Sequence, residues 1–370
     1  MKSAEDSAVM HHTARLRALR RALLRQGIES LLVTHLPDVR WLCGFTGSNA
    51  ALAITSRKAV LFTDGRYTAQ AKEETQAARV VIAKGSALKE ACALLEASAA
   101  GAAFDPEQTT VRQLGMMREA LPAKARRSFF QPLKAPVVSE LRMVKDADEL
   151  RVMEEAAAVG CTLFDAILPH IVPGVPETEI AATLEFFARS LGAEGMSFET
   201  IVASGQRSAL PHGRATEAKL PRNGFVTLDF GVILKGYCSD MTRTVCLGKP
   251  DGEARQAYDA VLEAQQAAVE AVRPGATCGE VDEAARAVLR KAGLAQYFTH
   301  STGHGVGLEI HELPRVAAGQ RAELVPGMMI TIEPGIYLAG KFGVRIEDMV
   351  AVTDRGRRVL TPAVKALIEL

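Results

Sequence analysis

Residues 225–247 read FVTLDFGVILKGYCSDMTRTVCL, and this stretch decides how the C-terminal part of the chain folds. Its two halves are rich in Val, Thr, Ile, Tyr and Phe, with a turn near Lys235 and Gly236, a pattern that predicts a β-hairpin. A turn centred just before Lys235 places Asp229 directly opposite Asp240. Facing residues on paired strands have Cβ atoms about 4.5–5.5 Å apart, and like charges at that distance repel each other. The hairpin therefore brings two carboxylates together at a cost in free energy.

Two interpretations of this hairpin stay open at this point. In the first, a cation lies between the aspartates, because carboxylate oxygens are hard ligands that bridge divalent metal ions. In the second, the hairpin slips by one residue around Gly236, so that one aspartate points to solvent and no site forms. The hairpin alone does not decide between them, and the rest of the chain must.

The length of the chain, 370 residues, exceeds the size at which one hydrophobic core stops growing, so we expect at least two domains. Hydrophobic residues make up 48% of the sequence, enough to fill both cores. The formal net charge is +1 and no long basic run occurs, which argues against nucleic acid or an anionic membrane as a partner. A small, roughly neutral substrate fits this composition better.

The cysteines and the N-terminal segment predict a reduced, cytoplasmic protein. No CxxC spacing occurs, which argues against a zinc ribbon and a disulfide framework, so we expect reduced and mostly buried thiols. The cysteines are Cys43, Cys92, Cys161, Cys238, Cys246 and Cys278. The N-terminal segment contains no apolar run of signal-peptide length, and no later run is long enough to span a bilayer.

Residues 1–135 are predicted to form a compact α/β domain, because strand-like and helix-like segments alternate along them. Two of its stretches, residues 38–50 and 63–71, contain aromatic residues and glycines, which we interpret as core residues and turn formers. The proline-containing segment QPLKAP at residues 131–136 marks the boundary of this domain.

The second domain, residues 136–370, contains an internal repeat. The segment IVPGVPETEIAATLEFFARSLGAEG, which starts at Ile171, resembles AVRPGATCGEVDEAARAVLRKAGLAQ, which starts at Ala271. In each copy a long helix enters a Pro-Gly turn, a second amphipathic helix follows, and strands come after it. We therefore expect two related α+β halves around a pseudo-twofold axis, with a site between them, because pockets favour such junctions.

Two further segments of the second domain contain chemically active side chains. The first, residues 298–316, reads FTHSTGHGVGLEIHELPRV and has three histidines among glycines. His304 lies between Gly303 and Gly305, an unusual place for a core histidine. MMITIEPGIYLAGKFGVRIEDMVAVT, at residues 328–353, is predicted to form two strands joined by a loop, with Glu333 ending one strand and Glu347 inside the other. A buried carboxylate is costly without a partner, and a metal ion would be such a partner.

Together these segments supply four carboxylates and one imidazole, from Asp229, Asp240, His304, Glu333 and Glu347. Four negative charges converge only if about two divalent cations balance them, and an oxygen-rich set with one nitrogen suits Mn, Co, Fe or Zn. The sequence therefore predicts a dinuclear metal site. Two such ions clamp a bridging water, lower its pKa and polarise a carbonyl for hydrolysis.

The same segments resemble those of the Xaa-Pro peptidases of the prolidase and aminopeptidase P family, which are M24 metallopeptidases. The motifs that carry this resemblance are PHG at residues 211–213, LDFG and YCSD around the two aspartates, GHGVGLEIHELP, IEPGIY and VRIED. RWLCGFTGS and TDGRY extend it into the first domain, so that it covers nearly the whole chain. The resemblance implies a creatinase-like N-terminal domain, a pita-bread catalytic domain, and hydrolysis of the bond between an N-terminal residue and proline in short peptides.

The resemblance also implies roles for individual residues. Two divalent ions, usually Mn or Co and sometimes Zn or Fe, would be held by the five residues of the metal set, with Asp240 and Glu347 bridging both ions. Glu333 would also take a proton from the bridging water and pass it on. His212 and His311 match the two histidines that hold the substrate and stabilise the tetrahedral intermediate through hydrogen bonds.

Three more residues have roles that stay open in the sequence. Arg345 would orient the bridging carboxylates, since strand alternation puts it on the same face as Glu347; the alternative is a surface salt bridge. Arg315, directly after HELP, resembles a carboxylate clamp of some prolidases and would favour dipeptides, or else it is solvated. The resemblance also implies a homodimer in which the first domain of one subunit covers the active site of the other, a role that would fall to Trp41. Whether the substrate is a dipeptide or a longer peptide is therefore undecided.

The alternatives lie within the same fold or in a different class of function. Methionine aminopeptidase shares the five-ligand pattern, but it normally lacks the large first domain and its last ligand does not lie in VRIED. Creatinase shares both domains but lacks the metal ligands. A non-catalytic pita-bread protein that binds peptides as a scaffold would show substitutions at the ligand positions, and this sequence shows none.

Overall fold

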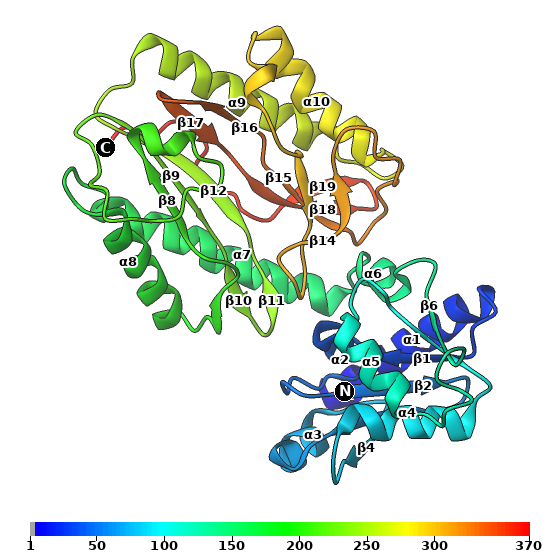
Figure 1. Cartoon of the computed structure of the whole chain (residues 1–370). Helices are drawn as coiled ribbons and strands as arrows, with labels where there is room; N and C mark the ends of the chain where they lie inside the picture. The colour runs from blue at the N-terminus through cyan, green and yellow to red at the C-terminus, as the bar shows by residue number, and fades with distance from the viewer. Residues whose placement is uncertain (1–3) are drawn as a thin grey trace. The chain divides into compact units, whose positions relative to one another are not determined.

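The computed structural model describes residues 4–370, with side chains from residue 11 onward. The chain divides into two compact units, one ending at Arg142 and the other spanning Met143–Leu370 (Figure 1). The first is an α/β domain and the second an α+β domain with an internal repeat, so the predicted fold class is confirmed. The boundary expected after residue 135 precedes a short helix, α6 (Val137–Arg142), that is part of the first unit.

A six-stranded mixed sheet lies at the centre of the first unit. Its strands, in spatial order, are β4 (Arg79–Ile82), β3 (Ala59–Thr63), β2 (Ala51–Thr55), β1 (Ser30–Val33), β5 (Ala102–Phe104) and β6 (Phe130–Pro132). β1 pairs antiparallel with β2 and parallel with β5, and all four of its residues are buried, as is typical of a central strand.

Besides α6, the helices described in the first unit are α1 (Ala4–Arg25), α2 (Leu36–Cys43), α3 (Thr68–Glu74), α4 (Ala87–Ser98) and α5 (Val111–Glu119), with a 3₁₀ turn η1 (Gly65–Tyr67). Ser86 and Thr110 accept hydrogen bonds from backbone N–H groups at the N-caps of α4 and α5. Gly27 follows α1 with φ +72°, the left-handed conformation of a helix end.

The strands of the second unit form four sheets. One three-stranded sheet has the spatial order β11 (Tyr237–Cys238), β10 (Val232–Leu234) and β7 (Gly195–Met196), and a second has the order β12 (Met241–Leu247), β9 (Gly224–Phe230) and β8 (Ile201–Ser204). The five-stranded sheet has the order β14 (Glu312–Val316), β13 (Gly303–Gly305), β15 (Met329–Ile332), β18 (Asp348–Thr353) and β19 (Gly356–Val359). The last sheet pairs β16 (Gly335–Leu338) with β17 (Phe342–Arg345). Three 3₁₀ turns complete the unit, η2 (Leu168–His170), η3 (Gly205–Ala209) and η4 (Ala295–Tyr297).

Two helix pairs enclose these strands, one pair from each copy of the repeat (Figure 1). They are α7 (Ala147–Ile167) with α8 (Glu177–Ser190), and α9 (Gly252–Ala271) with α10 (Cys278–Lys291). Gly174 and Gly275, in the two Pro-Gly turns, have φ of +88° and +79°, which glycine adopts without a steric penalty. The first pair packs against β8, β9 and β12, and the second against β15 to β18. Each half of the domain therefore has its own hydrophobic core, formed between a helix pair and the strands that it covers.

The predicted hairpin forms, but its register differs by two residues from the prediction. Asp229 faces Thr242 rather than Asp240, and the turn is centred between Lys235 and Gly236. Both turn residues have positive φ, +48° and +78°, as in a two-residue type I′ turn, whose twist matches that of the flanking strands. A shift by two preserves side-chain alternation, so both aspartates still leave the same face, and the slip by one residue does not occur.

The segment expected to form two strands contains four. β15 pairs with β18, while β16 and β17 form a separate hairpin between them. The expected loop is only the tight turn of this hairpin, where Gly340 has φ +76°. Glu333 directly follows β15, as predicted, but Glu347 lies in the break between β17 and β18 rather than inside a strand. Alternation of apolar residues did not show this break, because both sides of it are buried.

Two other expectations concern the whole chain. All six cysteines are free and five of them are buried, as predicted. Among the described residues, no helix is both long enough and apolar enough to cross a membrane.

Candidate metal centre

The four carboxylates and the imidazole predicted from the sequence come together in the second unit. His304 Nε2 lies 3.3 Å from Glu333 Oε1 and 3.6 Å from Asp240 Oδ2. One ligand atom each from Asp240, His304 and Glu347 lies within 4.8 Å of the others. Asp229 belongs to the same cluster, because its charge acts on the pKa of both Asp240 and Glu347. We call these five residues the carboxylate cluster.

Close approach of the hairpin arms positions the two aspartates. Asp229 lies in β9, and Asp240 lies just before β12, where the arms come together. A Cβ atom on Gly231 would lie 1.8 Å from the carbonyl oxygen of Ser239, so only glycine fits at this position. The glycine of the LDFG motif is therefore a packing requirement that lets the second arm carry Asp240 into the cluster.

Three carboxylate oxygens of the cluster are buried and accept no hydrogen bond within residues 11–370. They are Asp229 Oδ1, Asp240 Oδ1 and Glu347 Oε1. A buried polar group without a partner costs about 1–3 kcal/mol, and a charged one costs more. Divalent cations would satisfy all three oxygens, and a set of carboxylates with one imidazole suits such ions. The residues present therefore fit bound divalent metal.

Burial and mutual repulsion oppose simultaneous ionisation of the metal-free cluster. Burial, followed by the charge of Glu347, raises the pKa of Asp240 well above its ordinary value. Burial, followed by the charge of Glu333, does the same to the pKa of Glu347. Burial also acts to raise the pKa of Glu333, but the hydrogen bond and charge of His304 outweigh it and lower that pKa. All the carboxyl groups can be ionised together only when cations balance them, so metal binding is coupled to proton release.

Arg345 is buried beside the cluster and connects two of its carboxylates. Arg345 Nη2 donates to Asp229 Oδ2 at 2.6 Å, and Arg345 Nε donates to Thr242 Oγ1 at 3.1 Å. Thr242 Oγ1 in turn donates to Glu347 Oε2 at 2.7 Å. The Arg345 side chain is only 5% exposed, so its ion pair with Asp229 is not a surface salt bridge. This network fixes the orientation of both carboxylates.

Three residues beside the cluster were not assigned to it from the sequence: Thr242, Tyr337 and His300. Arg345 Nη1 donates to Tyr337 Oη at 2.7 Å, and the same oxygen lies 2.9 Å from His300 Nε2. The position of Thr242, two residues after Asp240, was a usable signal, since alternate residues share a strand face. Tyr337 lies on β16, which the sequence did not separate from a loop, so no periodicity placed it.

The two histidines expected to hold substrate border the carboxylate cluster. The ring centre of His311 lies 4.4 Å from that of His304. Burial, followed by the charge of His304, lowers the pKa of His311, so its imidazole is neutral over a wider pH range. The charge of His212 acts on the pKa of both His300 and His311, which places it at the same site. His212 and His311 are both exposed and accessible to a substrate.

Arg315 and Trp41 occupy very different environments. Arg315 pairs with His304 across β14 and β13, so both side chains leave the same face, and Arg315 is exposed. Trp41 is buried in the first unit, 5% exposed, with the guanidinium carbon of Arg15 4.9 Å from its ring centre. This placement matches the core role expected for aromatic residues of that stretch and lends no support to contact with substrate.

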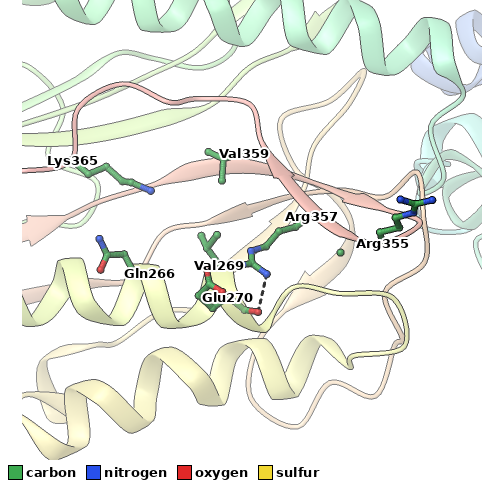
Figure 2. Close-up of a pocket in the computed structure, with 8 residues that line it drawn as sticks. Gln266, Val269, Glu270, Arg355, Arg357, Val359 and Lys365 are labelled. Carbon is green, nitrogen blue, oxygen red and sulfur yellow. Dashed lines mark hydrogen bonds and ion pairs between the residues drawn. The ribbon is translucent and has the colours of Figure 1, made fainter.

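A surface pocket of about 520 Å³ lies elsewhere in the second unit, between α9 and the β18–β19 turn (Figure 2). Cationic side chains line it, but each is directed differently: Arg357 Nη1 donates to the carbonyl oxygen of Glu270 at 3.1 Å, and Lys365 Nζ donates to Gln265 Oε1 at 3.2 Å. In Figure 2, Arg355 points away from both. No residue of the carboxylate cluster lines this pocket, so the groups suited to hydrolysis lie elsewhere.

Comparison with known proteins gives two matches that together cover most of the chain. Residues 151–354 match the family described as Metallopeptidase family M24, and residues 15–144 match the Creatinase/Prolidase N-terminal domain. The Xaa-Pro dipeptidase of Pyrococcus horikoshii is 35% identical over 352 residues, which is 93% of this chain and 95% of that protein.

Solved structures agree with these matches. A structure of an Xaa-Pro dipeptidase from Bacillus anthracis has a TM-score of 0.93 and 39% identity, covering 97% of this chain and 100% of the other. An X-Pro aminopeptidase from Thermotoga maritima has a TM-score of 0.84 and 35% identity, covering 93% of this chain and 98% of the other. The fold of this chain is thus shared with solved structures of an Xaa-Pro dipeptidase and an X-Pro aminopeptidase.

Proposed function

Because this chain belongs to metallopeptidase family M24, we propose that it catalyses metal-dependent hydrolysis of the peptide bond between an N-terminal residue and a following proline. The observation that carries this proposal is the set of three buried carboxylate oxygens without hydrogen-bond partners, grouped with His304. Such a set is costly in a metal-free protein and well suited to divalent cations. The protein is a metallo-exopeptidase, and its substrates are short peptides with proline in the second position.

The carboxylate cluster would hold two divalent ions per subunit, Mn or Co in first place and Zn or Fe as alternatives. When bound, such ions lower the pKa of a water molecule and polarise a carbonyl group. Support for a count of two comes from charge: one imidazole and one guanidinium, from His304 and Arg345, do not neutralise four carboxylates.

Glu333 is the proton carrier of the reaction. In the metal-free protein the hydrogen bond and charge of His304 outweigh burial and lower the pKa of Glu333, which favours the carboxylate form that can accept a proton. Thr331 Oγ1 donates to Glu333 Oε1 at 3.3 Å and limits its rotation. His212 and His311 hold the substrate and donate hydrogen bonds to the oxygen on which negative charge develops.

Arg315 would bind the C-terminal carboxylate of a dipeptide substrate. Its support is its exposure and its position opposite His304 on the same strand face, within the reach of a long side chain from the site. A bidentate contact from this guanidinium would favour dipeptides, whose carboxylate lies one residue from the scissile bond. Trp41 as a cover for the second active site of a homodimer stays a prediction, as do the homodimer itself and the cytoplasmic location.

The direct test uses protein reconstituted with manganese and two substrates, Ala-Pro and a longer peptide that begins Ala-Pro. Release of alanine from Ala-Pro alone would identify a dipeptidase, and release from both an aminopeptidase. Ala-Ala serves as the control that lacks proline, whose tertiary amide has no N–H to donate. The proposed function would be refuted if protein reconstituted in turn with manganese, cobalt, zinc and iron released no alanine from either proline substrate. A methionine aminopeptidase activity or a non-catalytic scaffold is less favoured, because the first domain and all five ligand positions are present.

A further inference from the structure

Glu177 is a fully buried carboxylate that the chemistry described above does not use. It lies in the first turn of α8, and none of its surface is exposed. All six hydrogen bonds that its side chain accepts in the described part of the chain come from three residues, Ser204, Arg207 and Thr216. Ser204 and Thr216 each donate from both the backbone N–H and the hydroxyl, at 2.9–3.1 Å. One carboxylate therefore joins the two ends of a single loop.

That loop carries His212. Arg207 connects the two, because its Nε donates to Glu177 Oε2 at 3.0 Å and its Nη2 donates to the carbonyl oxygen of Arg214 at 2.7 Å. The backbone N–H of Arg214 in turn donates to the carbonyl oxygen of His212 at 2.9 Å. A continuous path of hydrogen bonds thus runs from the buried carboxylate to the backbone of the exposed histidine.

The second half of the domain contains a carboxylate with similar partners, one hydroxyl residue and one arginine. Asp282, in the first turns of α10, is also fully buried. It accepts hydrogen bonds from both the backbone N–H and the hydroxyl of Thr302, at 3.2 and 2.8 Å. Arg286 Nε donates to Asp282 Oδ2 at 2.7 Å, while Arg286 Nη2 donates to the carbonyl oxygen of His300 at 2.6 Å.

This second carboxylate acts on the segment that carries metal ligands. Thr302 directly precedes Gly303 and His304, and its carbonyl oxygen accepts a hydrogen bond from the backbone N–H of Glu333 at 2.7 Å. In each half, therefore, a buried carboxylate binds a hydroxyl residue through two donors and an arginine that also binds a loop carbonyl. The positions are not equivalent in the repeat, since Glu177 aligns with Cys278, so the arrangement is not a simple copy.

Fold stability alone does not explain buried carboxylates of this kind. Desolvation of a charge is expensive, and apolar residues of similar volume often give equal or greater stability. A carboxylate with several fixed donors does, however, restrict a loop to one conformation. Catalytic groups need such restriction, because displacement of a group by 1 Å costs about 10²-fold in rate.

We propose that Glu177 and Asp282 are positioning residues with separate targets, Glu177 fixing His212 for substrate and Asp282 fixing His304 and Glu333 for metal. The inference about Glu177 rests on the proposed function, in which His212 binds substrate. The inference about Asp282 concerns metal retention and does not depend on the identity of the substrate. The two residues therefore differ in the quantity that each controls.

The test for Glu177 compares Glu177→Gln with Glu179→Gln, an exposed control two residues along the same helix. We expect Glu177→Gln to keep wild-type manganese content while kcat/KM for Ala-Pro falls by about 10²-fold. In a His212→Ala background, the same substitution should cause almost no further loss, because its target is already absent. An unchanged kcat/KM, or an equal loss in both backgrounds, would overturn the proposal. If Glu177→Gln does not fold, Arg207→Gln, in a residue that is a third exposed, takes its place with the same expectation.

The test for Asp282 compares Asp282→Asn with Glu283→Gln, its exposed neighbour. We expect the dissociation constant for manganese, measured by calorimetric titration, to rise about 10- to 100-fold in Asp282→Asn and to stay unchanged in Glu177→Gln. Wild-type manganese affinity in folded Asp282→Asn would refute the assignment, and so would metal loss in Glu177→Gln. A wild-type protein that fails to cleave Ala-Pro would refute the proposed function instead and leave the Asp282 result interpretable.

Discussion

Thr242 offers the clearest perturbation of the second layer of the site, because a Thr242→Val change removes one hydroxyl and nearly preserves the volume. Its hydroxyl donates to Glu347 Oε2 at 2.7 Å and accepts from Arg345 Nε at 3.1 Å, and the residue is fully buried. In the metal-free protein burial, followed by the charge of Glu333, raises the pKa of Glu347 well above its ordinary value, which favours its protonated form. The lost hydrogen bond to Glu347 then resembles one between neutral groups and costs about 0.5–1.5 kcal/mol of stability, and loss of the acceptor for the charged Arg345 Nε costs about 1.5–3 kcal/mol more, with or without metal.

Metal binding changes this magnitude. Glu347 must lose its proton to act as a ligand, and a hydrogen bond to an ionised group contributes about 1.5–3 kcal/mol. The contribution therefore rises by about 1–1.5 kcal/mol when metal binds, and since each 1.4 kcal/mol is a factor of about ten, Thr242→Val should weaken manganese binding roughly 5- to 10-fold. Thr227→Val is the matched control: Thr227 is also buried, but its hydroxyl pairs with Thr244 at 3.1 Å.

Two measurements are needed to separate the effects. Chemical denaturation of the metal-free proteins gives the change in stability, and calorimetric titration with manganese gives the change in affinity. We expect Thr227→Val to lose stability without a change in affinity, and Thr242→Val to lose both. Equal manganese affinity in Thr242→Val and the wild type would refute the reasoning that Thr242 orients a metal ligand.

Other predictions concern the ligands, pH and specificity. Asp240→Asn should abolish both turnover and metal content, measured by elemental analysis and by release of alanine; full activity without metal would contradict the account. The raised pKa values of Asp240 and Glu347, each caused first by burial, mean that their contribution to the stability of the metal-free protein is present at low pH and lost as the pH rises above their ordinary values of 3.8 and 4.5. Manganese binding at a pH where these groups are still protonated in the metal-free protein should accordingly release protons, seen as a binding heat that varies with buffer ionisation enthalpy; a constant heat across the pH range would count against it. Arg315→Ala should raise KM for Ala-Pro by about tenfold, the effect of one lost charged contact, and leave KM for a longer peptide unchanged. Equal increases in KM for both substrates would refute the proposed contact between Arg315 and the dipeptide carboxylate.

The ligand set could be predicted from the sequence because each member lies in a short motif with a distinctive neighbourhood. Asp229 precedes a glycine that the hairpin geometry requires, and His304 lies between two glycines. The internal repeat could be predicted for a similar reason, because local sequence signals define both its helix pairs and its Pro-Gly turns. These features depend on residues within a few positions of one another.

Features that depend on backbone torsion or on distant contacts were missed. The predicted hairpin register was wrong by two residues because Lys235 adopts positive φ. This conformation is uncommon for residues other than glycine, so the residue type did not indicate it. Thr242 and Tyr337 were not assigned because their importance comes from Arg345, which is 103 residues from Thr242 in the sequence. Arg345 itself was assigned from strand alternation with Glu347, although the structure places Glu347 outside a strand and joins the two through Thr242.

Crystals grown with manganese, measured at the manganese absorption edge, would test the central claim most directly, because anomalous scattering locates the ions independently of the protein coordinates. We expect two peaks inside the carboxylate cluster, each within about 2.0–2.6 Å of carboxylate oxygens, with one also bound to the imidazole of His304. Active enzyme with no anomalous peak among these five side chains would contradict the account.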